Sequence, residues 1–260
     1  TGTNQAVPIS YYRQFDAGQT VIASRTQATT ADDYLAQVAA LEGARGQQQE
    51  ILRLTNQALE LEPSALGYYH RGKAKQLLGD NQGAIGDYNM AISLDPKDVD
   101  TVHNRGVAKS GLGDYQGAIA DFNKALEIDP KNYISYDSIG LASLRSGDFR
   151  GAISAFSKAI EINPRFVNAY FNRGLAKHKS KDYQGAISDY NKAIEIDPMD
   201  AFTYGNRAVS RQHLCQKNAC QINDFQEVSE ICADYKKAAS LGNQATAQWL
   251  NSAGGAWCRN

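Results

Sequence analysis

The sequence carries almost no net charge and no long apolar segment. Its 260 residues sum to a formal net charge of −1, so no strong field attracts nucleic acid or an anionic membrane surface. No apolar run approaches the roughly 20 residues that a membrane span needs. We therefore expect no nucleic-acid partner and no direct insertion of this segment into a membrane.

Motifs of enzyme chemistry are missing as well. The sequence contains no HExxH, GxSxG or Walker motif, and no GxGxxG after an expected strand. The four histidines are His70, His103, His178 and His213, and none shares a metal-ligand spacing with a carboxylate or a cysteine. We expect them to be surface or groove residues, and we expect neither enzymatic activity nor a cofactor or metal.

Cysteine is scarce, and all four cysteines lie in the last quarter of the chain: Cys215, Cys220, Cys232 and Cys258. An even number confined to an irregular segment favours two disulfides, which imply an oxidising compartment. Buried thiols and a zinc site are the alternatives, although C-x4-C-x11-C-x25-C is not a usual zinc spacing. Four cysteines allow three connectivities, so the sequence leaves the pairing open.

What the sequence does contain is a repeat. The phrase QGAIADFNKALEIDP, which ends at Pro130, returns in variants that end at Pro96, Pro164 and Pro198, each 34 residues from the next. A second phrase precedes each one, such as VHNRGVAK from Val102. The apolar residues of the longer phrase have helical spacing, and a proline ends each unit because it disfavours helix in the residue before it. Each unit therefore predicts two helices.

Four columns of residues recur with the repeat. A glycine midway along the first helix predicts close approach of a neighbouring helix, since glycine otherwise costs about 1 kcal/mol there, and an aromatic residue is expected to fill the space between units. These columns are Gly72, Gly106, Gly140 and Gly174, and Tyr88, Phe122, Phe156 and Tyr190. Recurring arginines (Arg71, Arg105, Arg173 and Arg207) and aspartates (Asp87, Asp121 and Asp189) predict intramolecular ion pairs rather than an acid-binding stripe.

These columns resemble those of the tetratricopeptide repeat, whose 34-residue period they share. The resemblance covers residues 32–242 and implies an all-α fold, a right-handed superhelical solenoid of two-helix repeats. It divides the chain into an N-terminal arm at 1–31, a degenerate repeat at 32–64, four clean repeats at 65–98, 99–132, 133–166 and 167–200, a repeat with a Cys-containing insertion at 201–242, and a capping helix and tail at 243–260. Tyr11, Tyr12 and Phe15 of the arm either pack on the first repeat or belong to a disordered segment.

The resemblance also implies a function, a non-enzymatic scaffold that binds a protein or peptide on the concave face lined by the first helices. The non-packing columns of those helices give the candidate contacts Tyr69, Lys73, Gln76, His103, Val107, Asp137, Leu141, Phe171, Leu175 and His178. For Val107, Leu141 and Leu175, packing between adjacent first helices is the alternative. Tyr69 in place of a lysine, and the acidic Asp137, argue against the carboxylate clamp of chaperone-binding members.

The repeat sequence is similar to that of tetratricopeptide proteins common in cyanobacteria, some of which assist photosystem assembly at the thylakoid. This similarity implies an assembly factor for a photosynthetic membrane complex, located in the periplasm or at the thylakoid rather than in the cytoplasm. The start at Thr1 rather than Met fits a processed form and leaves open a removed signal or anchor. A metal- or redox-dependent domain using the C-terminal cysteines and a self-associating solenoid are the alternative functions.

Overall fold

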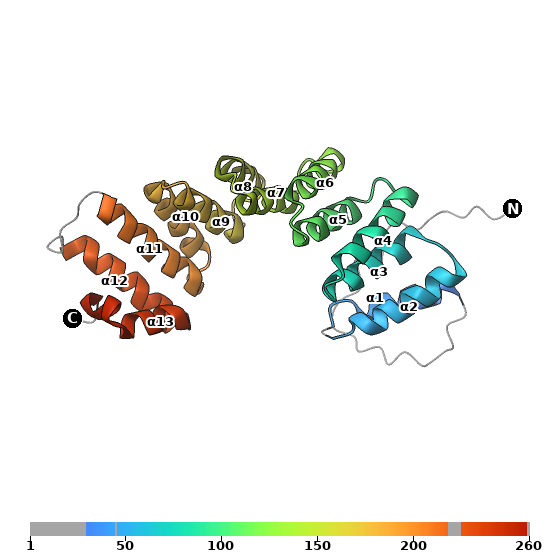
Figure 1. The fold of residues 1–260 in the computed structure, drawn as a ribbon, viewed down its shortest axis with the longest axis horizontal. Helices are drawn as coiled ribbons and strands as arrows, with labels where there is room; N and C mark the ends of the chain where they lie inside the picture. The colour runs from blue at the N-terminus through green and yellow to red at the C-terminus, as the bar shows by residue number, and fades with distance from the viewer. Residues whose placement is uncertain (1–29, 45, 218–224, 259–260) are drawn as a thin grey trace. The chain divides into compact units, whose positions relative to one another are not determined.

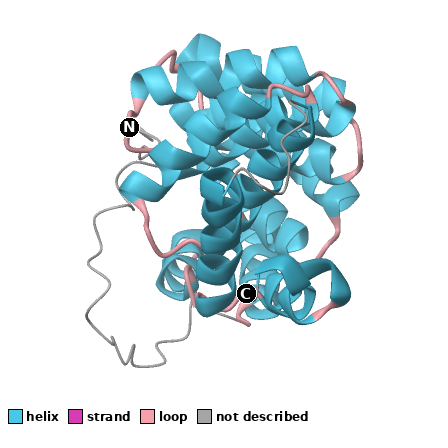
Figure 2. Ribbon diagram, turned by 90° about the vertical axis from the view of Figure 1, so that its left-hand side faces the viewer, coloured by secondary structure: helices cyan, strands magenta, loops and turns pink. Residues whose placement is uncertain are grey.

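The computed structural model describes residues 30–44, 46–217 and 225–258. These residues form thirteen α-helices and a short 3-10 helix, and none of them lies in a strand (Figure 2). The all-α prediction is therefore confirmed for the described chain. Tyr11, Tyr12 and Phe15 of the expected arm lie outside the described residues, and so does Cys220.

The chain divides into two compact units, and the first ends at Ile128. Its helices are α1 (Ala31–Leu41), α2 (Gln48–Leu61), α3 (Ala65–Leu77), α4 (Asn81–Leu94), α5 (Val99–Gly111) and α6 (Tyr115–Ile128) (Figure 1). Each odd-numbered helix packs against the even-numbered helix that follows it, and α1, α3 and α5 contact one another in order. Helix pairs are thus stacked so that the first helices of the repeats are neighbours.

The second unit begins at Asp129 and repeats this arrangement. Its helices are α7 (Tyr133–Ser146), α8 (Phe149–Ile162), α9 (Val167–Lys179), α10 (Tyr183–Ile196), α11 (Ala201–Lys217), α12 (Phe225–Ser240) and α13 (Gln244–Asn251), followed by the 3-10 helix η2 (Ala253–Cys258). Here α7, α9 and α11 are the neighbouring first helices, and α13 and η2 pack against α12.

The glycine column brings the two helices of each repeat into close contact. A Cβ added at Gly106 would lie 2.7 Å from the Phe122 ring, and one at Gly140 would lie 2.5 Å from the Phe156 ring. Both rings are buried. Gly72 and Gly174 face Tyr88 and Tyr190 in the same way, so the predicted close approach is confirmed.

The turn between the two helices of a repeat needs a left-handed residue. Gly79, Gly113 and Gly147 adopt φ values of 89°, 83° and 86° there, which only glycine adopts without strain. Lys181 holds the equivalent position of the next repeat at φ 67°, at a cost of roughly 1–2 kcal/mol. The aspartate that follows caps the second helix, as Asp148 does by accepting a hydrogen bond from the Gly151 N–H at 2.9 Å.

Buried ion networks join the helices within and between repeats. Arg105 donates from Nε to Asp121 at 2.9 Å, and Lys109 Nζ lies 2.8 Å from the same carboxylate. Arg105 Nη1 also donates to Asn89 of the preceding repeat, at 2.8 Å. The equivalent pairs are Arg71 with Asp87, Arg173 with Asp189 and Arg207 with Asp234. The predicted intramolecular pairing of the arginine and aspartate columns is confirmed.

The third clean repeat, residues 133–166, lacks this network. Ile139, Ser143 and Ala155 occupy the positions that arginine, lysine and aspartate hold in the repeat before it. Loss of one partner alone would leave an unpaired buried charge, which typically costs about 3–5 kcal/mol. The network is therefore present as a whole or absent as a whole.

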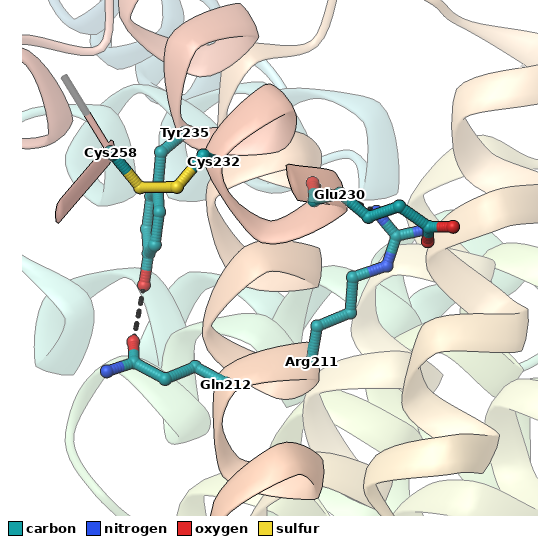
Figure 3. Close-up of a disulfide and its surroundings, with 6 residues drawn as sticks. All are labelled: Arg211, Gln212, Glu230, Cys232, Tyr235 and Cys258. Atoms are coloured by element: carbon teal, nitrogen blue, oxygen red, sulfur yellow. Dashed lines mark hydrogen bonds and ion pairs between the residues drawn. A yellow bond between two sulfur atoms is a disulfide. The ribbon is translucent and has the colours of Figure 1, made fainter. Parts of the chain in front are cut away.

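A disulfide secures the C-terminal end of the second unit (Figure 3). Cys232 of α12 and Cys258 of η2 are bonded, with Cα atoms 5.1 Å apart. Beside it, Tyr235 packs on Trp249 of α13 at a ring-centroid distance of 4.3 Å and donates its hydroxyl hydrogen bond to Gln212 at 2.9 Å. The end of the last repeat is covered as a solenoid cap requires.

The second expected disulfide has no counterpart in the described part of the chain. Cys215 is a half-buried free thiol, and Cys220 lies outside the described residues. Cys215 lies on α11 and takes no part in the disulfide, which joins α12 to η2.

Replacing Gly106 with Ala should destabilise the protein, because the new Cβ would overlap the Phe122 ring. We expect a loss of about 1–3 kcal/mol in the free energy of unfolding, measured by urea denaturation with circular dichroism. Gly86→Ala in α4 is the matched control, since nothing lies within 4 Å of the added Cβ. The higher helix propensity of alanine should raise its free energy of unfolding by at most about 1 kcal/mol. An equal effect of the two substitutions would contradict the close-approach explanation.

Candidate functional site

The candidate surface of the second unit follows its first helices. On α7, Ile134, Asp137, Leu141 and Leu144 recur at spacings of three and four residues, which places them on one face of the helix. Ile134 is 49% exposed, while Leu141 and Leu144 are half-buried and pack on the core formed with α8 and α9. We define the first-helix face of the second unit by Ile134, Asp137, Leu141, Leu144, Phe171, Leu175, His178 and Phe202.

Helices α9 and α11 extend this face with apolar side chains. Phe171 and Leu175 are half-buried, and the Phe171 ring lies 5.9 Å from the Tyr190 ring. Phe202 of α11 is 65% exposed and stands two repeat periods after Ile134. The face therefore carries accessible apolar groups on both of its outer helices.

His178 belongs to a ring cluster at the end of α9. Its Nδ1 lies 2.8 Å from Ser210 Oγ, and its ring lies 5.3 Å from the Tyr183 ring and 5.1 Å from the His213 ring. Desolvation, together with the positive charge that His213 can carry, lowers the pKa of His178. The lowered pKa favours the neutral form of the His178 ring at this end of the face.

In the first unit, two of the candidate side chains on α3 already have partners. Lys73 Nζ lies 3.0 Å from Glu42 Oε1, and Gln76 accepts a hydrogen bond from the Tyr88 hydroxyl at 2.7 Å. His70 also contacts Glu42, and the two cation-forming side chains hold the pKa of Glu42 down to about 2, with the His70 hydrogen bond as the largest cause. The Lys73 charge is therefore offset within the protein.

The column that begins with Tyr69 has a packing role as well. Tyr69 is buried in a core cluster with Tyr88, and the His103 ring lies 5.0 Å from the Phe122 ring. Burial lowers the pKa of His103 to about 4, so this ring is neutral at physiological pH. Val107, which is 36% exposed, is the most accessible apolar candidate of the first unit.

Asp137 differs from the other members of its column, which are aromatic, histidine or glycine. It is only 8% exposed, and the Asn172 side-chain amide, 3.4 Å from its Oδ1, is its one hydrogen-bond partner among the described residues. Burial raises the pKa of Asp137 to about 6, and the hydrogen bond from Asn172 opposes this rise in part. The sequence predicted a ligand-facing residue here, and the structure places it mostly below the surface.

Sequence reasoning missed several members and neighbours of the face. Ile134 and Phe202 share a column outside the predicted contacts, although their separation by two 34-residue periods and their large apolar side chains were visible in the sequence. His178 contacts Tyr183 of α10, the second helix of its own repeat, and His213 of the neighbouring first helix α11. The Tyr183 contact had no local signal in the sequence. Asn172 directly follows Phe171, and only the structure shows that it reaches Asp137.

The described residues offer little for other chemistry. Nowhere among them do three or more His, Cys, Asp or Glu side chains gather closely enough to hold a metal ion. None of the described helices is long and apolar enough to span a membrane.

Replacing Asp137 with Asn should stabilise the folded protein at neutral pH. The folded chain keeps the Asp137 proton up to a pKa of about 6, whereas the unfolded chain releases it near 3.8. The folded state therefore binds more protons between these values, and stability falls as the pH rises through this window and stays lower above it. The Asn variant lacks this penalty.

We expect Asp137→Asn to raise the free energy of unfolding by about 1–3 kcal/mol at about pH 7.5. The difference from the unmodified chain should disappear at about pH 3, below both pKa values, where Asp137 is mostly protonated in both states. Urea denaturation at the two pH values measures this. A variant that is no more stable than the unmodified chain at the higher pH would show that Asp137 is not an unfavourable buried charge.

Comparison with known proteins agrees with this geometry. A model described as a tetratricopeptide repeat matches residues 100–132 and 167–200, a second of the same description matches 65–98, and one described as a TPR repeat matches 140–181. No curated protein shows significant sequence similarity to the chain.

Solved structures share the fold at low sequence identity. MamA is 24% identical, with a TM-score of 0.57 over 68% of this chain and 96% of that one. PilF of Pseudomonas aeruginosa is 17% identical, with a TM-score of 0.65 over 87% of this chain and 95% of that one. YrrB, described as a TPR protein with an unusual peptide-binding site, is 18% identical, with a TM-score of 0.57 over 76% of this chain and 97% of that one.

At these identities the likeness concerns the fold, and the repeat models add the local sequence pattern. Residues 65–200 therefore contain tetratricopeptide repeats, and stacked helix pairs of this kind form a scaffold suited to protein–protein interaction.

Proposed function

We propose that this chain is a non-enzymatic scaffold that binds a protein or peptide segment on the first-helix face of its second unit. The observation that carries this proposal is the exposure of Ile134 and Phe202 at equivalent positions of α7 and α11. Half-buried Leu141 and Leu175 continue the apolar surface. Exposed apolar side chains that continue into half-buried apolar neighbours on one face are typical of interaction sites, and covering them releases about 25 cal/mol per Å² of apolar surface.

The composition of the face favours a peptide or helix as the bound segment. Aliphatic, aromatic and polar side chains alternate along α7 and α9, which suits a ligand that offers apolar anchors at regular spacing. The peptide-binding site named for YrrB supports this by analogy of fold. In the first unit, Val107 offers a smaller apolar contact, and Glu42 offsets the Lys73 charge that a carboxylate clamp would need.

Random peptides displayed on phage and selected on the immobilised full chain provide the test. We expect peptides that bind with micromolar affinity, and we expect Leu141→Ser or Leu175→Ser to weaken binding at least about tenfold, as loss of an apolar anchor does. Circular dichroism must show that both variants remain folded. Met90→Ser is the matched control, because Met90 is an exposed apolar residue on the second helix α4.

An unchanged affinity in both leucine variants would place the binding site elsewhere. Failure to select any peptide would contradict peptide binding by this surface. Weakening by Met90→Ser to the same extent would indicate nonspecific apolar adhesion instead of a defined site.

We further propose that the bound protein is a subunit of a photosynthetic membrane complex and that the chain assists its assembly or repair. The support for this step is the similarity of the repeat sequence to cyanobacterial tetratricopeptide proteins. Affinity purification from detergent-solubilised thylakoids should recover photosystem subunits with the unmodified chain and not with Leu175→Ser. Equal recovery by both chains, or no photosystem subunit with either, would contradict this role.

A further inference from the structure

In the described part of the chain, all buried aspartates except one are paired with cationic side chains. Five are buried: Asp87, Asp121, Asp137, Asp189 and Asp234. Four of them each pair with two cationic side chains, an arginine and a second lysine or arginine. Asp137 has no such ion pair among the described residues, and its one hydrogen bond comes from the Asn172 amide.

The repeat that contains Asp137 is also the repeat without the cations. Ile139 and Ser143 of α7 stand where Arg105 and Lys109 stand on α5. The helix that carries Asp137 therefore supplies neither of the two side chains that neutralise buried acids elsewhere in this protein. A buried carboxylate without a counter-charge is unfavourable, because its lost hydration is not replaced.

The neighbours of Asp137 on α7 offer apolar surface to the methylene groups of a long basic side chain. Ile134 lies one turn before it and Leu141 one turn after it on the same face of α7. Ile134 is exposed and Leu141 is half-buried, so an apolar path leads past the carboxylate. Lysine and arginine pack their methylene groups on such apolar surface while the charged end reaches an acid.

We propose that Asp137 recognises a lysine or arginine side chain of the bound protein or peptide segment, with apolar residues of that segment covering Ile134 and Leu141. This inference rests on the proposed function and names the chemistry of the ligand. Charge complementarity selects a basic residue because Asp137 is the buried aspartate that no cation pairs with in the described part of the chain. Asn172 holds the carboxylate in place from α9.

The test uses peptides selected on the full chain from a random phage-displayed library. We expect the selected sequences to share a lysine or arginine flanked by apolar residues. The Kd of the best synthetic peptide, measured by isothermal titration calorimetry, should rise at least about tenfold with Asp137→Asn. Glu161→Gln, which removes an equal charge from an exposed position on α8, should change it less than about twofold.

A matching change in the peptide separates a direct contact from an indirect effect. Replacement of the basic residue by norleucine should weaken binding to the unmodified chain by a similar factor and should cause no further loss with Asp137→Asn. Circular dichroism must show that Asp137→Asn remains folded, so that unfolding is excluded as the cause of a loss. Independent, additive losses from the two changes would overturn the proposal.

The outcomes distinguish this inference from the function it rests on. Peptides that bind through the first-helix face without a basic residue, and with equal affinity for Asp137→Asn, would overturn the inference and leave the proposed function standing. Failure of every peptide to bind the unmodified chain would overturn both.

Discussion

Every clean repeat of this chain depends on one contact, a glycine of the first helix against an aromatic ring of the second. Because glycine has no Cβ, the ring can approach its backbone closely. In the four clean repeats, an added Cβ would lie only 2.5–2.8 Å from the nearest ring atom. This contact fixes the facing sides of the two helices and leaves the remaining sides of the first helix for neighbours and partners. The first-helix face is therefore a consequence of how the repeat is packed.

The ion networks add a second constraint, and they act as units. Each arginine joins the aspartate of its own repeat to a polar side chain of the repeat before it, as Arg173 joins Asp189 to Ser157. In residues 133–166 the network is replaced by Ile139, Ser143 and Ala155, and in the same repeat Asp137 is buried with no cationic partner among the residues that the structure describes. The repeat that lacks the ion network is thus the same repeat that carries Asp137, the residue proposed to recognise a basic side chain of the partner.

The sequence was sufficient for the fold, because a 34-residue period with fixed glycine, aromatic, arginine and aspartate columns describes both helices and their main contacts. It was less sufficient for the site. Periodicity shows which face of a helix a residue occupies but not how deeply it is buried, so Tyr69 and Asp137 were expected to face a ligand and are largely buried. The exposed Ile134 and Phe202 lay in a column that was not considered. The Cys232–Cys258 bond depends on the path of η2, which no repeat pattern describes.

Photo-crosslinking tests most directly whether the first-helix face of the second unit holds the partner. The photoreactive residue p-benzoylphenylalanine would replace Leu175 on that face, or the exposed Lys192 on the second helix α10, and a selected peptide would then be bound and irradiated. We predict a covalent peptide adduct from position 175 and none above background from position 192. An adduct from position 192 with none from position 175 would contradict the proposed binding face.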